Sequence, residues 1–396
     1  MITEKMPLNG GEDIALKRQL PALSLAELNE EMAAIGQPVF RSKQVRDWLM
    51  KGITDPAQMR NIPAELRTQL ENRLLCSPLK LAERQCSADG TRKYLFNLAR
   101  GGSVETVLIP EASRATVCVS SQIGCVLDCP FCHTGTQSFS GNLTAGEIIA
   151  QVLAVKADLL NEPLNNPLPE SLHQQVTHVV YMGMGEPLAN ETAVYQSLHR
   201  LMDTDGLKLS RRRITVSTSG LSAAIARLGA SAPVNLAISL HAAIDTLRDE
   251  LVPINRKYPL AELRAALNAY PLPVQRHITL EYVMLDGIND RNEDLAALAR
   301  FVNPQRERIN LIHFNAWPDS PYAGSSKQHM NNFAKQLIKK GIRATVRRSR
   351  GDDIMAACGQ LKSQTDVLLR NTACNSENRR NRPHQDGASE VKDDNE

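Results

Sequence analysis

The chain lacks the features that place a protein in a membrane or send it through one. None of its apolar runs approaches the length of about 18 residues that a membrane-spanning helix needs. The first residues, MITEKMPLNGGEDIALKRQL, include acids and have no apolar core, so they do not resemble a secretory signal. The net charge is only +3, so the chain as a whole is not a polyelectrolyte. We expect a cytoplasmic protein with no membrane partner, in which clustered cysteines are metal ligands or catalytic thiols.

The N-terminal part shows helical signals followed by strand signals. Residues 1–20 are expected to be a mobile tail. Ser24 and Glu27 have the spacing of a capping box before LAELNEEMAAIG, and two more short helical stretches follow at 41–51 and 63–74. Strand patterns with hairpin turns begin near Leu79. We assign residues 21–100 to an N-terminal accessory domain.

This accessory domain carries an excess of basic residues. Between Phe40 and Lys93 there are eleven basic and six acidic residues. Such a run is commonly a solvated helix face, but it can also be a surface that contacts nucleic-acid phosphates. The segment alone does not decide between the two.

From Thr116 onward, predicted strands and helices alternate. The expected strands are 116–120, 176–182, 213–217, 234–239, 277–284, 308–314 and 344–348; the expected helices are 145–160, 191–203, 222–228, 260–269, 290–301 and 327–340. This repeat predicts an α/β fold with a parallel sheet, and about six units indicate a partial (βα)6 barrel. The core should span residues 101–365, with a surface insertion at 161–175 and a disordered tail at 366–396.

Four of the eight cysteines lie in one stretch, CVSSQIGCVLDCPFCHTG. Cys125, Cys129 and Cys132 have the spacing C-x3-C-x2-C. A structural zinc site usually has four ligands in two C-x2-C pairs, and this run has no second pair. The adjacent His133 is sterically awkward as a fourth ligand. A [4Fe–4S] cluster takes one thiolate per iron, so three thiolates leave one iron open to a cofactor. The spacing favours the cluster.

Polar residues and a glycine turn follow several of the predicted strands. In chain order these residues are Gly185, Glu186, Ser217, Ser239, Leu240, His241 and Asn315. Any one of them alone is commonly a helix cap or part of a tight loop. Because the ends of parallel strands meet at one edge of a sheet, the set as a whole indicates a cofactor site.

Two further cysteines lie far apart in the sequence. Cys118 is on the first strand of the repeat, and Cys358 is near the end of the predicted core. A lone buried cysteine is usually only a small apolar residue. However, seven basic residues lie between Lys335 and Arg350 with no acid among them. Positive charge favours a thiolate and also attracts phosphate.

These motifs together resemble the RlmN family of the radical SAM superfamily. The resemblance covers residues 20–361 and is carried by GCVLDCPFCHTG, MGMGEPL, VSTSG, ISLHA, FNAWP and RGDDIMAACGQL. It implies an enzyme that methylates adenine C2 in 23S ribosomal RNA and in transfer RNA, there 3′ to the anticodon. It also implies a [4Fe–4S] cluster on the three clustered cysteines, two molecules of S-adenosylmethionine (SAM) per turnover, and an electron donor such as flavodoxin. We expect a monomer.

The resemblance further implies a ping-pong mechanism with a covalent RNA intermediate. Cys358 carries the methyl group as S-methylcysteine, Glu105 is the general base that removes the C2 proton, and Cys118 resolves the intermediate by forming a transient disulfide. Disulfide exchange requires the two sulfurs to meet. We therefore expect the Cα atoms of Cys118 and Cys358 to lie within about 7 Å, or a mobile segment to carry Cys358 there.

Two alternatives remain at this point. A Cfr-like enzyme methylates adenine C8 in 23S ribosomal RNA with the same set of cysteines, and the motifs do not separate C8 from C2. A non-catalytic RNA-binding protein with a structural metal site is the alternative of another class. It predicts that replacing Cys358 leaves RNA binding intact.

Overall fold

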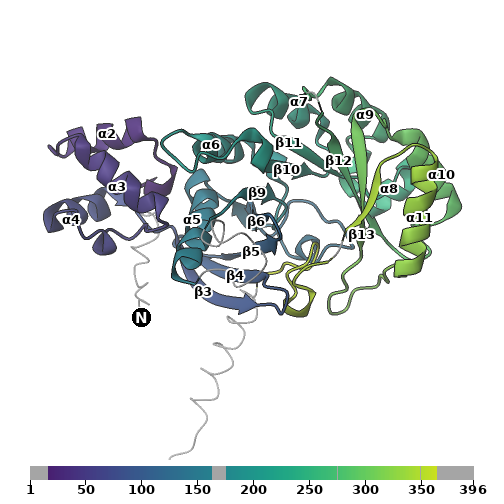
Figure 1. The fold of residues 1–396 in the computed structure, drawn as a ribbon, viewed down its shortest axis with the longest axis horizontal. Helices are drawn as coiled ribbons and strands as arrows, with labels where there is room; N and C mark the ends of the chain where they lie inside the picture. Colours follow the sequence, from purple (N-terminus) through teal and green to yellow (C-terminus); the bar gives the residue numbers. More distant parts are fainter. Residues whose placement is uncertain (1–16, 163–174, 274, 348, 364–396) are drawn as a thin grey trace, which may run out of the picture.

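The computed structural model describes residues 17–162, 175–273, 275–347 and 349–363 (Figure 1). Most of the expected N-terminal tail and insertion, and all of the expected C-terminal tail, lie outside these residues. No helix in the described part of the chain is long and apolar enough to cross a membrane.

A small helical unit begins the described chain and lies at one end of the molecule (Figure 1). Its helices are α2 (Leu25–Ala34), α3 (Phe40–Met50) and α4 (Ala64–Arg73). The predicted capping box starts α2, because Glu27 N–H donates to Ser24 Oγ and the Glu27 carboxylate accepts Ser24 N–H at 2.8 Å. The unit has its own apolar core, and Arg46 and Arg200 bridge it to the barrel through backbone carbonyls.

One ten-stranded sheet forms the rest of the framework. Its order is β14-β13-β12-β11-β10-β9-β6-β5-β4-β3. The antiparallel strands are β3 (Leu79–Cys86), β4 (Arg92–Leu98) and β5 (Ser103–Glu111). The parallel strands are β6 (Arg114–Cys118), β9 (His178–Tyr181), β10 (Ile214–Thr218), β11 (Asn235–Ser239), β12 (Ile278–Met284), β13 (Glu307–His313) and β14 (Ala344–Arg347). The expected boundary at residue 100 therefore falls inside the antiparallel extension, because β3 and β4 pair with the core sheet and not with the helical unit.

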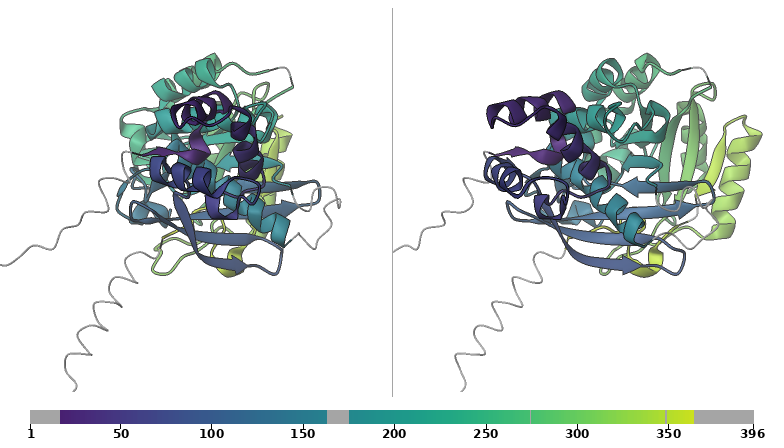
Figure 2. Two further views of the ribbon diagram at one scale, coloured as in Figure 1. Left: turned by 90° about the vertical axis from the view of Figure 1, so that its left-hand side faces the viewer. Right: turned by 60° about the vertical axis from the view of Figure 1, so that its left-hand side comes forward.

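Helices cover the outer face of the curved parallel sheet (Figures 1 and 2). They are α5 (Ala145–Asn161), α6 (Glu191–Met202), α7 (Ser222–Ser231), α8 (Asp245–Leu251), α9 (Leu260–Ala269), α10 (Asn292–Phe301) and α11 (Lys327–Lys339). The partial (βα)6 barrel is confirmed, with six helical connections between its parallel strands. The sequence did not predict α8, because seven residues are too few to show a helical period.

The parallel strands are apolar along most of their length because helices cover one face and the barrel interior covers the other. All seven residues of β12 are buried. Beneath the strand ends, the fully buried Arg248 donates hydrogen bonds to the carbonyls of Ser219 (2.6 Å) and Leu240 (3.0 Å) and to Asn255 Oδ1 (2.8 Å). This guanidinium fixes the loops after β10 and β11, which carry predicted site residues.

Candidate active site

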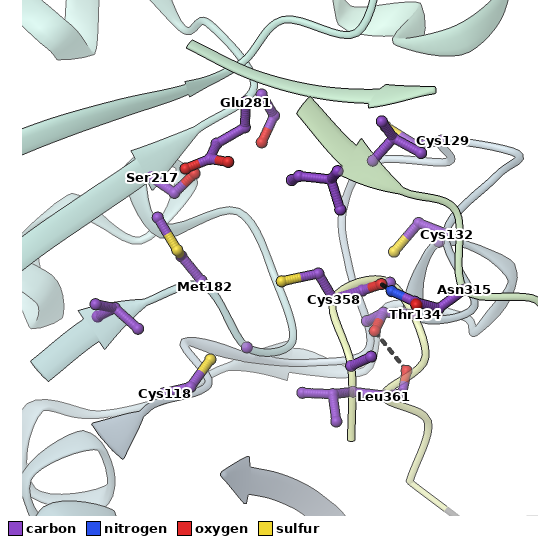
Figure 3. Close-up of a pocket in the computed structure, with 18 of the residues that line it drawn as sticks. Cys118, Cys129, Cys132, Thr134, Met182, Ser217, Glu281, Asn315, Cys358 and Leu361 are labelled. Carbon is purple, nitrogen blue, oxygen red and sulfur yellow. Dashed lines mark hydrogen bonds between the residues drawn. The ribbon is translucent and has the colours of Figure 1, made fainter. Parts of the chain in front are cut away.

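A cavity opens at the carboxyl ends of the parallel strands (Figure 3). Eleven of the predicted site residues line it: Cys118, Cys125, Cys129, Cys132, Gly185, Glu186, Ser217, Ser239, His241, Asn315 and Cys358. Leu240 does not line it, because its side chain is fully buried in the main apolar core. Glu105 is also outside the lining and lies behind the segment that follows Cys358.

The three clustered cysteines lie on the loop 124–140, which is closed by pairing of β7 (Gln122–Ile123) with β8 (Gly141–Asn142). Burial raises the pKa of all three thiols, and that of Cys125 reaches about 12. Backbone N–H groups compensate in part, since Leu127 N–H donates to Cys125 Sγ at 3.4 Å. Such N–H···S bonds are typical of iron–sulfur sites, where they tune the cluster.

The same loop brings three sulfur donors near one another. Among the described residues, no group of three His, Cys, Asp or Glu side chains is gathered closely enough to hold a single ion. A [4Fe–4S] cluster binds each of its cysteine thiolates to a different iron. Cys125, Cys129 and Cys132 are close enough to interact electrostatically, and they supply soft sulfur donors. These residues fit the cluster.

Close backbone packing shapes the loop at Gly135. A Cβ on this residue would lie 2.6 Å from the carbonyl oxygen of Cys129. Gly135→Ala is therefore expected to displace Cys129 and to lower the iron content after anaerobic reconstitution by at least about half. Thr136→Ala is the matched control, because Thr136 is exposed and its side chain bonds only to His133 O among the described residues. Equal iron content in the two variants would contradict this account.

The loop 124–140 is bonded directly to the segment 349–363, which carries Cys358. His133 N–H donates to Gly359 O at 2.8 Å, and Thr134 Oγ1 donates to Leu361 O at 2.6 Å (Figure 3). The His133 ring stacks on Trp317 with the ring centres 4.8 Å apart. Two parts of the chain that are more than 200 residues apart therefore hold each other at the cavity.

The glycine turn after β9 is held by Glu186. Gly185 has φ +98°, and a Cβ there would lie 2.5 Å from Gln122 Cβ, so the turn requires glycine. The Glu186 carboxylate accepts N–H groups from Leu188 (3.0 Å) and Ser219 (2.8 Å), although burial raises its pKa. Its side chain therefore ties the turn to the end of β10.

His241 follows β11 with a left-handed backbone, φ +57°. Its Nδ1 accepts Val283 N–H at 3.1 Å, and its ring meets the edge of Phe131, which precedes the last clustered cysteine. Burial lowers the pKa of His241 to about 3, so the ring is neutral at physiological pH. Asn315 contacts the segment 349–363 instead: its Oδ1 accepts Ser349 Oγ–H at 2.7 Å, and its Nδ2 donates to Cys358 O at 3.4 Å.

Cys118 and Cys358 face the same cavity from different parts of the fold. Figure 3 shows their sulfurs pointing toward one another, and both cysteines are free thiols. Burial and the nearby Cys358 raise the pKa of the Cys118 thiol to about 12. Cys358 is only partly buried. The structure thus brings the two sequence-predicted thiols to one cavity without a bond between them.

Glu105 lies on β5, on the same strand face as Val107, which pairs with Cys118 and lines the cavity. Its carboxylate is 3.3 Å from Lys93 Nζ and accepts Lys362 N–H at 2.9 Å. Burial raises the pKa of Glu105, while Lys93 acts against this shift. The segment 349–363 therefore covers the predicted base in this conformation.

Sequence reasoning missed Glu281 as a charged residue of the cavity, and it noted Arg347 and Arg350 only as members of a basic run. Glu281 Oε1 accepts Asn310 Nδ2–H at 3.2 Å, whereas Oε2 is buried and has no partner among the described residues. Figure 3 shows its carboxylate beside Ser217. The available signal was a glutamate within the apolar strand ITLEYVM, since such a position is expensive for a carboxylate.

The barrel, the three-cysteine loop and the glycine turn are features of a radical SAM enzyme. A profile described as the radical SAM superfamily matches residues 119–302, and one described as the ribosomal RNA large subunit methyltransferase N-terminal domain matches residues 19–75. The chain is 45% identical to the dual-specificity RNA methyltransferase RlmN of Dinoroseobacter shibae over 363 residues, covering 90% of this chain and 92% of the relative. Its identity to that of Rhodopseudomonas palustris (strain HaA2) is 46% over 377 residues, covering 92% and 94%. The chain belongs to the RlmN family.

A solved structure agrees with this assignment. The crystal structure of a radical SAM methyltransferase from Sphaerobacter thermophilus superposes with a TM-score of 0.82 at 41% identity. The match covers 88% of this chain and 100% of that structure. The likeness thus extends over the accessory domain and the barrel together.

Proposed function

We propose that this protein methylates C2 of a specific adenine in 23S ribosomal RNA and of the adenine 3′ to the anticodon in transfer RNA. The observation that carries the proposal is the shared cavity: the three-cysteine loop, Cys118 and Cys358 all line it, and the loop is bonded to the segment of Cys358. A metal-binding RNA-binding protein has no need for two further thiols facing the same cavity.

The residues that line the cavity suit the cofactors that this reaction needs. Cys125, Cys129 and Cys132 would hold the cluster in the same cavity as SAM. The other SAM contacts are Gly185, Glu186, Ser217, Ser239, Leu240, His241 and Asn315, and Leu240 offers only its backbone because its side chain is buried. The free Oε2 of Glu281 suits the ribose hydroxyls. When bound, the cluster and SAM would supply the radical chemistry that activates the S-methyl group of Cys358.

The thiols of Cys358 and Cys118 carry out the remaining steps of methyl transfer. Cys358 carries the methyl group and becomes linked to adenine C2 through its methylene carbon. Cys118 then attacks Cys358 Sγ, the S–CH2 bond breaks, and its electron pair goes to the methylene carbon, which takes up a proton. The product is methyladenine, and the two sulfurs are left oxidised as a disulfide, which cellular thiols reduce.

Glu105 is the proposed base for the C2 proton, and its raised pKa brings it nearer to the working pH. The segment 349–363 has to move away from the Glu105 carboxylate before RNA reaches it. Because an amide cannot take the proton, Glu105→Gln is expected to slow RNA methylation about 10²- to 10⁴-fold. Peptide mass spectrometry should still find S-methyl-Cys358 in this variant.

Glu83→Gln is the matched control for Glu105. Glu83 is exposed and lies near enough to Glu105 to interact with it electrostatically, but it does not line the cavity. We expect normal methylation from this variant. A Glu105→Gln protein with parental activity would remove Glu105 from the mechanism.

The partners follow from the same proposal. The basic accessory domain, residues 21–100 as first assigned, contacts RNA; the exposed Phe40 and the partly buried Arg41 lie together at the start of α3, with the guanidinium 4.9 Å from the ring centre. A one-electron donor such as flavodoxin supplies electrons to the cluster. We propose that the protein acts as a monomer in the cytoplasm.

The decisive assay distinguishes methylation at adenine C2 from methylation at adenine C8. Reconstituted protein is incubated anaerobically with methyl-labelled SAM, a reductant and each RNA, and the digested nucleosides are compared with 2-methyladenosine and 8-methyladenosine standards. Label in 2-methyladenosine from both RNAs is expected. Label in 8-methyladenosine assigns the Cfr-like activity, and no labelled nucleoside from either RNA overturns the proposed function.

A further inference from the structure

One side of the active-site cavity carries a guanidinium group to which no role has been given. Arg347 is the last residue of β14, where it pairs with Ile312 of β13, and it lines the cavity together with Cys118 and Cys358. In the sheet, five strands separate β14 from β6, which ends at Cys118. Only the curvature of the partial barrel brings the two strand ends to one cavity.

The side chain of Arg347 has no structural partner among the described residues. Within the described ranges, its guanidinium forms no hydrogen bond and no ion pair within 4.0 Å. The other arginine of the lining, Arg350, is held by Asp89 at 3.6 Å. Arg248, below the strand ends, donates to carbonyl groups. The charge of Arg347 is therefore available to groups that face the cavity.

The charged and titratable groups that interact electrostatically with Arg347 are, from the strongest to the weakest, Cys358, Glu281, Cys118 and Glu111. Toward Cys118 itself the cavity presents Cys358, Arg347 and a backbone hydrogen bond from Met182. Burial and Cys358 disfavour the Cys118 thiolate, whereas Arg347 is the one side chain among these that favours it. The resolving step needs a thiolate, since a thiol is a poor nucleophile.

We propose that Arg347 is the positioning residue that stabilises the Cys118 thiolate for its attack on Cys358 Sγ. This assignment rests on the proposed function. The guanidinium takes no part in bond making: the S–S bond forms, the S–CH2 bond of the RNA adduct breaks, and the methylene carbon receives the electron pair and a proton. Arg347 raises the share of Cys118 that carries the negative charge.

Arg347→Gln tests the assignment, with Cys118→Ala prepared in parallel. Loss of a nearby positive charge raises a thiol pKa by roughly one unit or more, which lowers its thiolate share about tenfold. Arg347→Gln is expected to be isolated with RNA covalently bound to Cys358. Release of methylated RNA from that adduct should be about tenfold slower than in the parent at about pH 7.5. The difference should shrink as the pH rises, because hydroxide then deprotonates Cys118 without help.

Two control variants separate charge from packing. Arg343→Gln should release RNA at the parental rate, because Arg343 is exposed and does not line the cavity. Arg347→Lys keeps the positive charge but has a shorter side chain. Its rate of RNA release should therefore lie between those of the parent and Arg347→Gln. If Arg347→Gln does not fold, Arg347→Met, which also removes the charge, carries the test, and parental release at about pH 7.5 then overturns the assignment.

The outcomes separate this inference from the proposed function. If Cys118→Ala carries no covalent RNA, the proposed function fails. If Cys118→Ala carries RNA but Arg347→Gln releases it at the parental rate, only the role of Arg347 is overturned. Absence of S-methyl-Cys358 in Arg347→Gln also overturns the role, because Arg347 then acts in the first methylation. A slow release that does not recover at high pH overturns it as well.

Discussion

Cys118→Ala protein, expressed in cells with its natural RNA substrates, is expected to be purified with RNA covalently bound at Cys358. Without the Cys118 sulfur, no group of the described cavity lining other than the cluster cysteines can attack Cys358 Sγ as a thiolate. Catalytic turnover should fall by about 10⁴-fold or more, as is usual when a nucleophile is removed. Denaturing electrophoresis before and after ribonuclease treatment measures the adduct.

Cys86→Ala is the matched control for this variant, because Cys86 is exposed on β3 outside the cavity. It should carry no RNA and should methylate normally. The double variant Cys118→Ala/Cys358→Ala should also carry none, because the attachment atom is gone. If the Cys118→Ala protein were free of RNA and still turned over, a ping-pong mechanism through these two thiols would be wrong.

Cys129→Ala is expected to abolish the brown colour and most of the iron of the reconstituted protein, together with methylation. Cys129 is partly buried, and desolvation with its two neighbouring thiols raises its thiol pKa well above the usual value. A metal that binds the thiolate offsets this cost, so the site is built for a bound cluster and not for a free thiol. We expect activity to fall by about 10⁴-fold or more.

Iron and sulfide analysis checks this prediction, and Cys76→Ala serves as a control because Cys76 is buried in the separate core of the helical unit. Cys76→Ala should retain iron and colour even if it lowers stability. A colourless parent protein with one zinc per chain would contradict the cluster assignment directly.

Sequence patterns predicted the βα repeat well because its signals are local. The capping box of Ser24 and Glu27 and the alternation of apolar strands with amphipathic helices need only near neighbours in the chain. The boundary of the accessory domain was harder to place. Whether β3 and β4 belong to the helical unit or to the sheet depends on the pairing of β4 with β5. The hydrophobic periodicity of a strand does not show which strand it pairs with.

The site was predictable where spacing defines the chemistry and unpredictable where the fold defines it. The three-cysteine spacing identified the loop, and the family resemblance paired Cys118 with Cys358. By contrast, nothing local shows that Lys362 covers Glu105, or that Arg347 reaches the Cys118 side of the barrel. Those facts depend on the curvature of the sheet and the path of the chain after β14.

The bonds from His133 to Gly359 and from Thr134 to Leu361 also bear on how the enzyme matures. Thermodynamic linkage is reciprocal: the free energy by which docking of the segment 349–363 favours iron binding at the loop 124–140 is the free energy by which iron binding favours the docking. Loss of the cluster to oxygen therefore weakens the docking of the methyl carrier, and a protease should cut the iron-free enzyme near Cys358 first. Iron content and resistance to cleavage near Cys358 should therefore change together.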